Sequence, residues 1–374
     1  MKQTVLIFST GLGFGGTSVV VSIAKQIAQR GWSVTFLVAV KPENQRKVDE
    51  LESAGIRVLS LEMRRRRLPM RGFLRLLRLL RTLKPEILHC HSVHANLLGR
   101  VGRVFSPVPV VISSAHNINE GGRWRELGYR VTDGLADMTT QVSEIAAQRY
   151  IGIKAVSKKK MMVIPNGIDI SAFRRNDKSR KDGRQELQVA DEFVWLGIGR
   201  LRPQKNFPLM FRAFKIVLSE YSKALLVVVG DGPLNKFLRG YSKDLGIEEN
   251  VRFLGVRGDV ARVMNLADGF VLSSSWEGMP MVLLEAAACE LPIVATNVGG
   301  VSEVFEHGKG GYLVPPGDET QLASHMVRVM QMPADVRGGF ADLARKRVEK
   351  EFDIGKLGDR WDKLYSRLLN EKGL

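Results

Sequence analysis

The sequence has few cysteines, no long apolar run and no recognisable targeting segment. Its 374 residues include only two cysteines, Cys90 and Cys289, and neither has a CxxC neighbour. Neither a disulfide framework nor a zinc site is indicated, and a cytosolic location is expected. The apolar run before Ser9 is too short for a signal peptide. No run approaches the roughly 20 apolar residues of a membrane span, so any membrane contact is expected to be peripheral.

The positive charge is confined to one half of the chain. Residues 1–190 carry 32 Lys and Arg against 15 Asp and Glu, a net charge of +17, whereas residues 191–374 carry 24 of each. This asymmetry predicts an anionic partner, membrane or nucleic acid, for the first half.

Both halves show short apolar runs alternating with stretches of helical spacing, which predicts βαβ units, parallel sheets and an α/β fold class. The length predicts two domains. We place an N-terminal domain at 1–180, a C-terminal domain at 190–352 and a last helix at 353–374, with the polar segment 171–190 as the connection. Strands are expected at 4–8, 33–39, 56–60, 86–90, 108–113, 138–142, 161–164, 193–198, 225–229, 251–254, 270–273 and 293–296.

A glycine-rich loop, Gly11 to Gly16, follows the first strand and precedes a helix, so its backbone N–H groups are suited to phosphate. It formally matches GxGxxG. A dinucleotide site also needs an acid at the end of the second strand, and none occurs before Glu43. A tight turn is the alternative.

Arg200 and Lys205 lie on the loop after the first strand of the second half. A planar guanidinium and a point charge ahead of a helix are suited to a diphosphate. Two solvated loop cations are the alternative.

The strongest motif runs from Glu277 to Glu285. Glu277 is expected just before a helix and Glu285 inside it, with Pro280 in the first turn and apolar residues between. A carboxylate on a mostly buried helix needs a partner, and sugar or ribose hydroxyls are suitable ones. A helix-start acid and a structural ion pair are the alternatives.

His116 follows the strand at 108–113, at the edge where α/β proteins place their sites. It is suited to contact a sugar or a developing charge, or else to a loop or capping role. His89, His91 and His94 show no metal-ligand pattern, and we interpret them as structural or as lining the edge of a pocket.

Residues 64–84 contain nine cations and no acid. On a helix from about Met70 the arginines are expected to face outward, opposite an apolar arc that packs on the sheet. Anionic lipid is the favoured partner, and a solvated face is the alternative. Nucleic acid is not favoured, because no zinc-finger, RRM or KH pattern is present and no aromatics interleave with the cations. The predicted membrane residues are Arg64, Arg65, Arg66, Arg67, Arg71, Arg75 and Arg78.

Together these motifs resemble the retaining glycosyltransferases of family 4, which have the GT-B fold. The similarity covers nearly the whole chain: Gly15-Gly16, His116-Asn117, Ile164 to Asp169, Gly199-Arg200 with Lys205, and Glu277 to Glu285 continuing to Glu303. The resemblance implies two Rossmann-like domains facing across a cleft. The donor would lie in the second, the acceptor in the first, and the last helix would cross back to the first.

The resemblance also implies the roles of single residues. Arg200 and Lys205 would hold the diphosphate and stabilise the leaving charge, and Glu285 would hold the ribose. Glu277 and His116 would contact the sugar, and Gly16 would approach the phosphate. The expected catalytic residues are His116, Glu277, Arg200 and Lys205, and the expected donor-binding residues are Gly15, Gly16, Arg200, Lys205, Glu277, Gly278, Met279, Pro280, Met281, Val282 and Glu285.

The implied reaction transfers a hexose or N-acetylhexosamine from a nucleotide sugar, taken as UDP-linked, with retention, by same-face displacement. The expected acceptor is a lipid-linked glycan, and the expected location is the inner face of the cell membrane. No Asp-x-Asp motif occurs, so neither metal nor cofactor is expected. Ser18 stands where the family often has Glu, and Gly-Met-Pro follows Glu277 in place of the frequent Gly-Phe-Gly. A nucleotide-sugar epimerase and a non-catalytic anionic-surface binding protein are the alternative functions.

Overall fold

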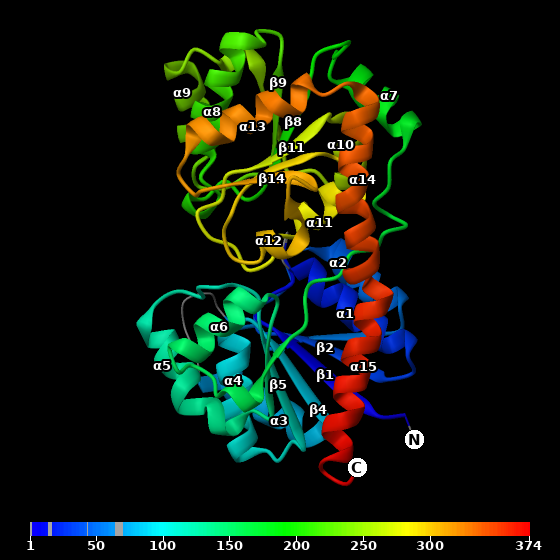
Figure 1. Ribbon diagram of the computed structural model, residues 1–374. Helices are drawn as coiled ribbons and strands as arrows, with labels where there is room; N and C mark the ends of the chain where they lie inside the picture. The colour runs from blue at the N-terminus through cyan, green and yellow to red at the C-terminus, as the bar shows by residue number, and fades with distance from the viewer. Residues whose placement is uncertain (1, 14–16, 43, 64–69) are drawn as a thin grey trace. The chain divides into compact units, whose positions relative to one another are not determined.

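The structure, a computed structural model, describes residues 2–13, 17–42, 44–63 and 70–374. The chain divides into two compact units. The first consists of Met1–Gly167 with Ile354–Leu374, and the second of Ile168–Asp353. Each contains a seven-stranded parallel sheet flanked by helices (Figure 1). None of the described helices is both long and apolar enough to cross a membrane.

The first unit has the strand order β3-β2-β1-β4-β5-β6-β7. Its strands are β1 (Thr4–Ser9), β2 (Ser33–Val38), β3 (Arg57–Ser60), β4 (Ile87–His91), β5 (Val110–Ala115), β6 (Met138–Gln141) and β7 (Met161–Val163). Its helices are α1 (Thr17–Gln29), α2 (Gln45–Ser53), α3 (Met70–Leu83), α4 (Val93–Phe105), α5 (Arg123–Thr132), α6 (Glu144–Gly152) and α15 (Ile354–Asn370).

The central strands of this sheet are buried on both faces, as their near-continuous apolar sequences require. The side chains of successive β4 residues point to opposite faces of the sheet. Leu88 and Cys90 join the apolar core beneath α3. His89 points the other way and contacts Trp361 and Tyr365 of α15.

Helix α15 belongs to the first unit although it follows the entire second unit in the chain. It packs on α1. The indole Nε1 of Trp32 donates to Asp362 at 2.7 Å, and Arg30 forms an ion pair with Asp359 at 2.7 Å. The helix therefore completes the cover of one face of the sheet.

The second unit has the strand order β10-β9-β8-β11-β12-β14-β13. Its strands are β8 (Val194–Ile198), β9 (Leu225–Val229), β10 (Val251–Gly255), β11 (Gly269–Leu272), β12 (Ile293–Thr296), β13 (Glu306–His307) and β14 (Gly310–Val314). Its helices are α7 (Asp177–Glu186), α8 (Phe207–Glu220), α9 (Asn235–Asp244), α10 (Val260–Leu266), α11 (Met281–Ala288), α12 (Val301–Val304), α13 (Glu319–Gln331) and α14 (Ala334–Glu351). The apolar faces of α8 and α13 and the strands between them form the core.

The segment at 171–190 is not the bare connection that its polarity predicts. The first part of unit 1 ends at Gly167, so residues 171–180 belong to the second unit, not the first. Helix α7 forms here because Asn176 caps it, accepting from the backbone N–H of Ser179 at 2.8 Å. The interpretation of the segment as a linker was wrong. Helix α7 has no apolar face that a sequence pattern would reveal, because charged contacts hold it in place.

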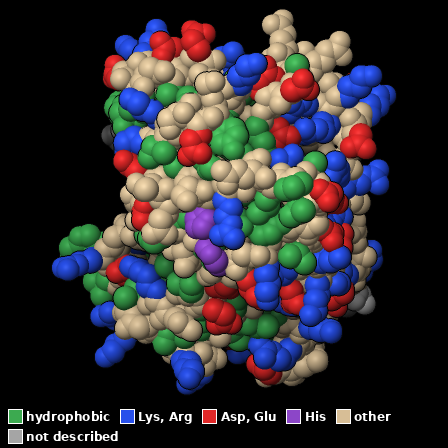
Figure 2. All heavy atoms as spheres, turned by 45° about the horizontal axis from the view of Figure 1, so that its top comes forward, with side chains coloured by type: hydrophobic (Ala, Val, Ile, Leu, Met, Phe, Trp, Pro, Cys, Tyr) green, Lys and Arg blue, Asp and Glu red, His purple; other side chains and the backbone are tan. Residues whose placement is uncertain are grey.

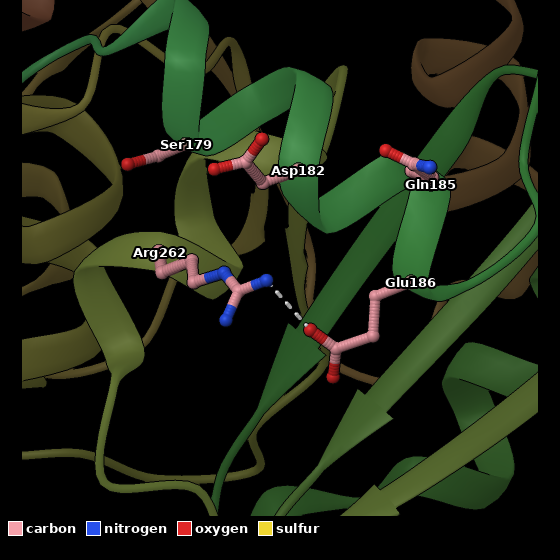
Figure 3. A pocket seen from close by; sticks show the side chains of 5 residues that line it. All are labelled: Ser179, Asp182, Gln185, Glu186 and Arg262. Atoms are coloured by element: carbon pink, nitrogen blue, oxygen red, sulfur yellow. Dashed lines mark ion pairs between the residues drawn. The ribbon is translucent and has the colours of Figure 1, made fainter.

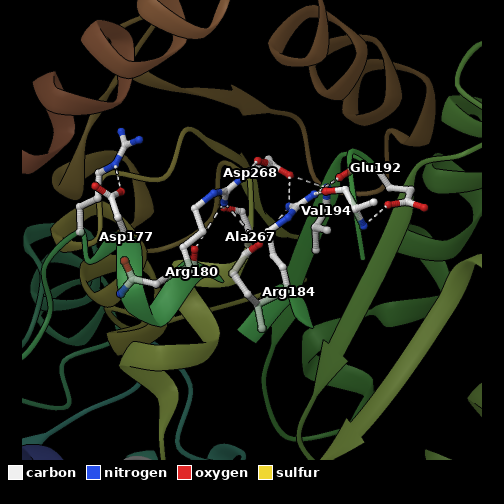
Figure 4. A network of polar contacts seen from close by, with 11 residues as sticks. Asp177, Arg180, Arg184, Glu192, Val194, Ala267 and Asp268 are labelled. Atoms are coloured by element: carbon white, nitrogen blue, oxygen red, sulfur yellow. Dashed lines mark hydrogen bonds and ion pairs between the residues drawn. The ribbon is translucent and has the colours of Figure 1, made fainter. Parts of the chain in front are cut away.

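Those contacts converge on one carboxylate (Figure 4). Asp268 accepts from Arg180 at 2.5 Å, from Arg184 at 3.0 Å and from the backbone N–H of Val194 at 2.9 Å. Its side chain is only 10% exposed. Asp268 thus joins α7 to the start of β8.

We expect Asp268→Ala to lower the free energy of unfolding by about 3 kcal/mol, because it leaves two arginines without their shared carboxylate. Chemical denaturation of the full chain measures this. Asp177→Ala is the matched control on the same helix, since Asp177 is exposed and its ion pair is long at 3.7 Å. Equal effects of the two substitutions would show that α7 is not held through Asp268.

Candidate active site

Two loops of the second unit are joined at the carboxyl edge of its sheet. They follow β8 and β11, which are neighbouring strands although 70 residues separate their sequences. The backbone N–H of Ser275 donates to the carbonyl of Gln204 at 2.8 Å. The Ser273 hydroxyl donates to the carbonyls of Lys205 and Asn206, each at 2.9 Å. The two loops therefore form one rigid platform.

On this platform Lys205 and Glu277 form an ion pair. Lys205 Nζ lies 2.6 Å from Glu277 Oε1, and both side chains are largely buried. The Ser274 hydroxyl also donates to Oε1, at 2.7 Å, and Gln204 Nε2 lies 3.5 Å from Oε2. The buried carboxylate is thus compensated by a charge and by hydrogen bonds. The two residues were expected to bind a ligand separately, and the pair was not predicted.

Glycines bring a third loop against Glu277. Gly299, with φ of +52°, comes so close that a Cβ there would lie 2.0 Å from the carbonyl oxygen of Glu277. The backbone N–H of Gly300 donates to the carbonyl of Gly278 at 2.7 Å. This approach explains the glycine at 299, because any side chain there would displace the Glu277 backbone.

The remaining residues of the motif lie at the start of α11. Pro280 is the N-cap and not part of the first turn, and the helix begins at Met281. Met279 and Pro280 are buried, whereas Met281 and Val282 are partly exposed.

Glu285 lies one turn into α11 between buried leucine and alanine residues. Its removal from water raises the pKa of its carboxyl to about 7, and the charge of Lys205 acts in the opposite direction. Among the described residues its carboxylate accepts no hydrogen bond and forms no ion pair. Lys205 therefore acts electrostatically on two carboxylates and contacts one of them.

Arg200 differs from Lys205 in being exposed. Its charge contributes to the lowered pKa of Asp231, after hydrogen bonds to that carboxylate from the Asn235 side chain and the Gly232 backbone. It forms no ion pair with a described residue. Its guanidinium is therefore available to a ligand.

In the first unit His116 follows β5 and lies beside His91, the last residue of the neighbouring β4. His91 Nδ1 and His116 Nε2 are 3.0 Å apart. Burial lowers the pKa of His116 to about 4, so its ring is neutral at neutral pH. Histidine side chains gather at one place on the face shown in Figure 2, beside basic side chains.

Two polar groups near these predicted residues were not identified from the sequence. Burial raises the pKa of Glu120 to about 7; it accepts from the Tyr129 hydroxyl at 2.8 Å and from the His116 backbone at 3.4 Å. Lys47 Nζ contacts Gly13, Thr17 and Ser18 at 2.8 to 2.9 Å, and burial lowers its pKa to about 8. In the sequence each of them is only a charged residue close to a predicted loop, and that pattern does not identify a site residue.

Some expectations fall on residues outside the described ranges, namely Gly15, Gly16 and Arg64 to Arg67. The other predicted membrane residues, Arg71, Arg75 and Arg78, are exposed on α3. Arg75 forms an ion pair with Glu62 at 2.9 Å, an acid just outside the segment in which none was counted. In the described part of the chain no group of three His, Cys, Asp or Glu residues is placed to hold a metal ion.

A surface pocket of about 560 Å³ lies between α7 and α10 (Figure 3). Its lining residues are Ser179, Asp182, Gln185, Glu186 and Arg262, and Glu186 and Arg262 form an ion pair at 2.8 Å. None of the predicted site residues lines it, and its lining has two acids, Asp182 and Glu186, against one cation, Arg262.

Two sequence families match the chain. Residues 179–347 match glycosyl transferases group 1, and residues 14–172 match glycosyltransferase family 4. The chain is 29% identical over 320 residues to the UDP-Gal:alpha-D-GlcNAc-diphosphoundecaprenol alpha-1,3-galactosyltransferase of Escherichia coli, covering 81% of each protein. It is 30% identical over 214 residues to the N-acetyl-alpha-D-glucosaminyl L-malate synthase of Bacillus anthracis, covering 57% of this chain and 55% of that one.

Solved structures share the whole fold. HepE of Anabaena in complex with UDP-glucose superposes with a TM-score of 0.85 at 21% identity, covering 97% of this chain and 99% of that one. WaaG, a glycosyltransferase involved in lipopolysaccharide biosynthesis, gives a TM-score of 0.75 at 18% identity, covering 96% and 99%. The fold predicted from the resemblance, GT-B with two doubly wound α/β units, is confirmed.

The raised pKa of Glu285 predicts a pH dependence of stability. The folded state holds the proton more tightly than the unfolded state, in which the pKa is about 4.5. The resulting stabilisation is complete below that pH and is lost as pH rises through about 7. From pH 5 to 8.5 we expect the free energy of unfolding to fall by about 2 to 3 kcal/mol more in the wild type than in Glu285→Gln.

Denaturant unfolding at the two pH values measures the difference, with the exposed substitution Glu248→Gln as control. Parallel pH dependence of wild type and Glu285→Gln would contradict the raised pKa. Glu120 titrates in all three proteins, so its contribution cancels.

Proposed function

Because this chain belongs to the retaining glycosyltransferases of family 4, enzymes that use nucleotide sugars, we propose the finer steps of its reaction. The donor is a UDP-linked hexose or N-acetylhexosamine, and the acceptor is a lipid-linked glycan in cell-surface polysaccharide synthesis. The names of the relatives support both parts. The E. coli relative uses UDP-Gal and a diphosphoundecaprenol-linked sugar, and HepE was solved with UDP-glucose.

The observation that carries the proposal is the Lys205–Glu277 pair at the carboxyl edge of β8 and β11. The charge of Lys205 also acts on the carboxylate of Glu285. A cation that contacts one carboxylate and acts electrostatically on another fits a donor that has a diphosphate and two sets of hydroxyls. Lys205 with Arg200 takes the diphosphate, Glu285 takes the ribose and Glu277 the transferred sugar. Gly278 to Val282 border the donor.

The chemistry follows from charge development at the leaving diphosphate. As the sugar–oxygen bond breaks, negative charge grows on the phosphate, and fixed cations stabilise it more in the transition state than in the ground state. The departing phosphate oxygen accepts the proton of the acceptor hydroxyl on the same face of the sugar, so the configuration is retained. His116 contacts the sugar near the reacting carbon. No metal takes part, because Lys205 and Arg200 supply the positive charge.

The acceptor's lipid places the enzyme at the cytoplasmic face of a membrane, and exposed side chains of the first unit fit such a surface. Arg71 and Arg78 are exposed on α3 on either side of Leu74, which is 56% exposed. On α4, which packs between α3 and α5, Val104 and Phe105 are exposed. On α5 Trp124 and Val131 are 85% and 70% exposed. Cations interleaved with exposed apolar and aromatic groups are typical of a surface for anionic lipid.

We expect Lys205→Met to lower kcat for sugar transfer about a hundredfold to a thousandfold, because one stabilising cation at the leaving group is lost. The double variant Lys205→Met, Glu277→Gln removes both charges of the buried pair and separates this effect from misfolding. It should keep the thermal stability of the wild type and remain equally inactive. Lys215→Ala, at an exposed position of α8, is the control. Near-normal transfer by either Lys205 variant would refute the donor assignment.

We expect reversal of Arg71, Arg75 and Arg78 to Glu to release the protein from vesicles of anionic phospholipid, since each cation contributes about 1 kcal/mol near the surface. Trp124→Ser should weaken binding further, through the apolar contact. Cosedimentation measures both. Reversal of Lys215, Lys223 and Lys236, exposed in the second unit, makes the same change in net charge and should leave binding intact. Unchanged cosedimentation of the arginine variant would remove the membrane assignment.

A further inference from the structure

Among the described residues, the buried side chain of His91 has one hydrogen-bond partner, and that partner is the candidate catalytic histidine. Its side chain is fully buried at the end of β4. Nδ1 lies 3.0 Å from Nε2 of His116, and the two rings are stacked with centroids 5.2 Å apart. Nε2 of His91 is buried and has no hydrogen-bond partner among the described residues.

No neighbouring histidine relieves this orphaned nitrogen. His89 lies against His91 with ring centroids 4.0 Å apart and planes tilted by 42°, but its own ring nitrogens are already used. Nδ1 of His89 bonds the Tyr365 hydroxyl at 2.6 Å, and Nε2 bonds the Ser114 hydroxyl at 2.7 Å. Among the described residues, the ring of His91 therefore has one polar contact, the one between its Nδ1 and His116 Nε2.

The orphaned nitrogen decides where the proton between the two rings lies. Both rings are neutral at neutral pH, since burial lowers the pKa of each, and a neutral imidazole has one donor and one acceptor nitrogen. If His116 donated from Nε2, His91 would carry its proton on Nε2, as a buried N–H without an acceptor. Orphaned N–H groups are among the rarest features of protein interiors. If His91 donates from Nδ1, only a lone pair is left without a partner.

We propose that His91 is a positioning residue that donates from Nδ1 to His116 Nε2 and thereby holds His116 as its Nδ1–H tautomer. His116 Nδ1, which has no hydrogen-bond partner among the described residues, then always presents a donor. A donor at this place is suited to an oxygen of the transferred sugar. The catalytic consequence rests on the proposed role of His116, whereas the tautomer itself does not.

Substitutions at position 91 distinguish a side chain that donates a hydrogen bond from one that only fills the space. His91→Leu fills the cavity without an N–H, so we expect His116 to shift toward the Nε2–H tautomer. We also expect kcat to fall about tenfold or more, as is common when a partner that orients a functional histidine is lost, with the KM for the donor nearly unchanged. His91→Asn offers an amide N–H close to the former Nδ1 and should restore both the tautomer and kcat to within a few-fold. His307→Asn, exposed in the second unit, is the control.

The tautomer is read from ¹⁵N NMR of the full chain labelled on histidine, with the His116 signals assigned by their loss in His116→Gln. Six histidines are present. An Nε2–H signal for His116 in the wild type overturns the proposal, and this measurement needs no variant at position 91. A tautomer unaffected by His91→Leu also overturns it. If the tautomer shifts as expected while kcat stays constant, the proposal for His91 holds and the role assigned to His116 fails.

Discussion

Parallel strands all end at the same edge of their sheet, and every polar group of the candidate site depends on that constraint. Lys205 follows β8 and Glu277 follows β11, and the sheet makes these strands neighbours. His91 ends β4 and His116 follows β5, which is again an adjacent pair. In each unit, two side chains remote in sequence therefore lie within hydrogen-bonding distance of each other, because the sheet brings their strands side by side.

Burial then determines the chemistry of these groups. The carboxylate of Glu277 is compensated by Lys205 and Ser274, whereas Glu285 lacks such a contact and its pKa rises to about 7. The histidines of the first unit are neutral for the same reason. Burial therefore leaves a compensated ion pair, Lys205–Glu277, in the second unit and neutral histidines in the first.

Much of this could be predicted from the sequence. The strands end within two residues of their expected positions, because buried parallel strands are written as apolar runs. Strands β13 and β14 and helix α7 were missed. Strand β13 has only two residues, both polar, and β14 begins with two glycines. Helix α7 has almost no apolar face, and Asp268, which holds it in place, lies 84 residues from Arg184.

The site residues could be named but not paired. The Lys205–Glu277 contact spans 72 residues and follows from a strand order that skips β9 and β10. Glu120 lies in a loop with an ordinary polar sequence. Nothing in that sequence indicates that its carboxylate accepts a hydrogen bond from the Tyr129 hydroxyl. Local patterns identify chemical groups, whereas tertiary topology decides which of them meet.

Helix α15 also has a consequence for synthesis of the protein. The ribosome makes the sheet of the first unit first and α15 only after the whole second unit. Until then Trp32 lacks its acceptor, Asp362, and His89 lacks the Tyr365 hydroxyl. The second unit, which is continuous in the chain, can complete its core earlier. One face of the first unit's sheet therefore stays incompletely covered while the second unit is made, and the half made first is the half finished last.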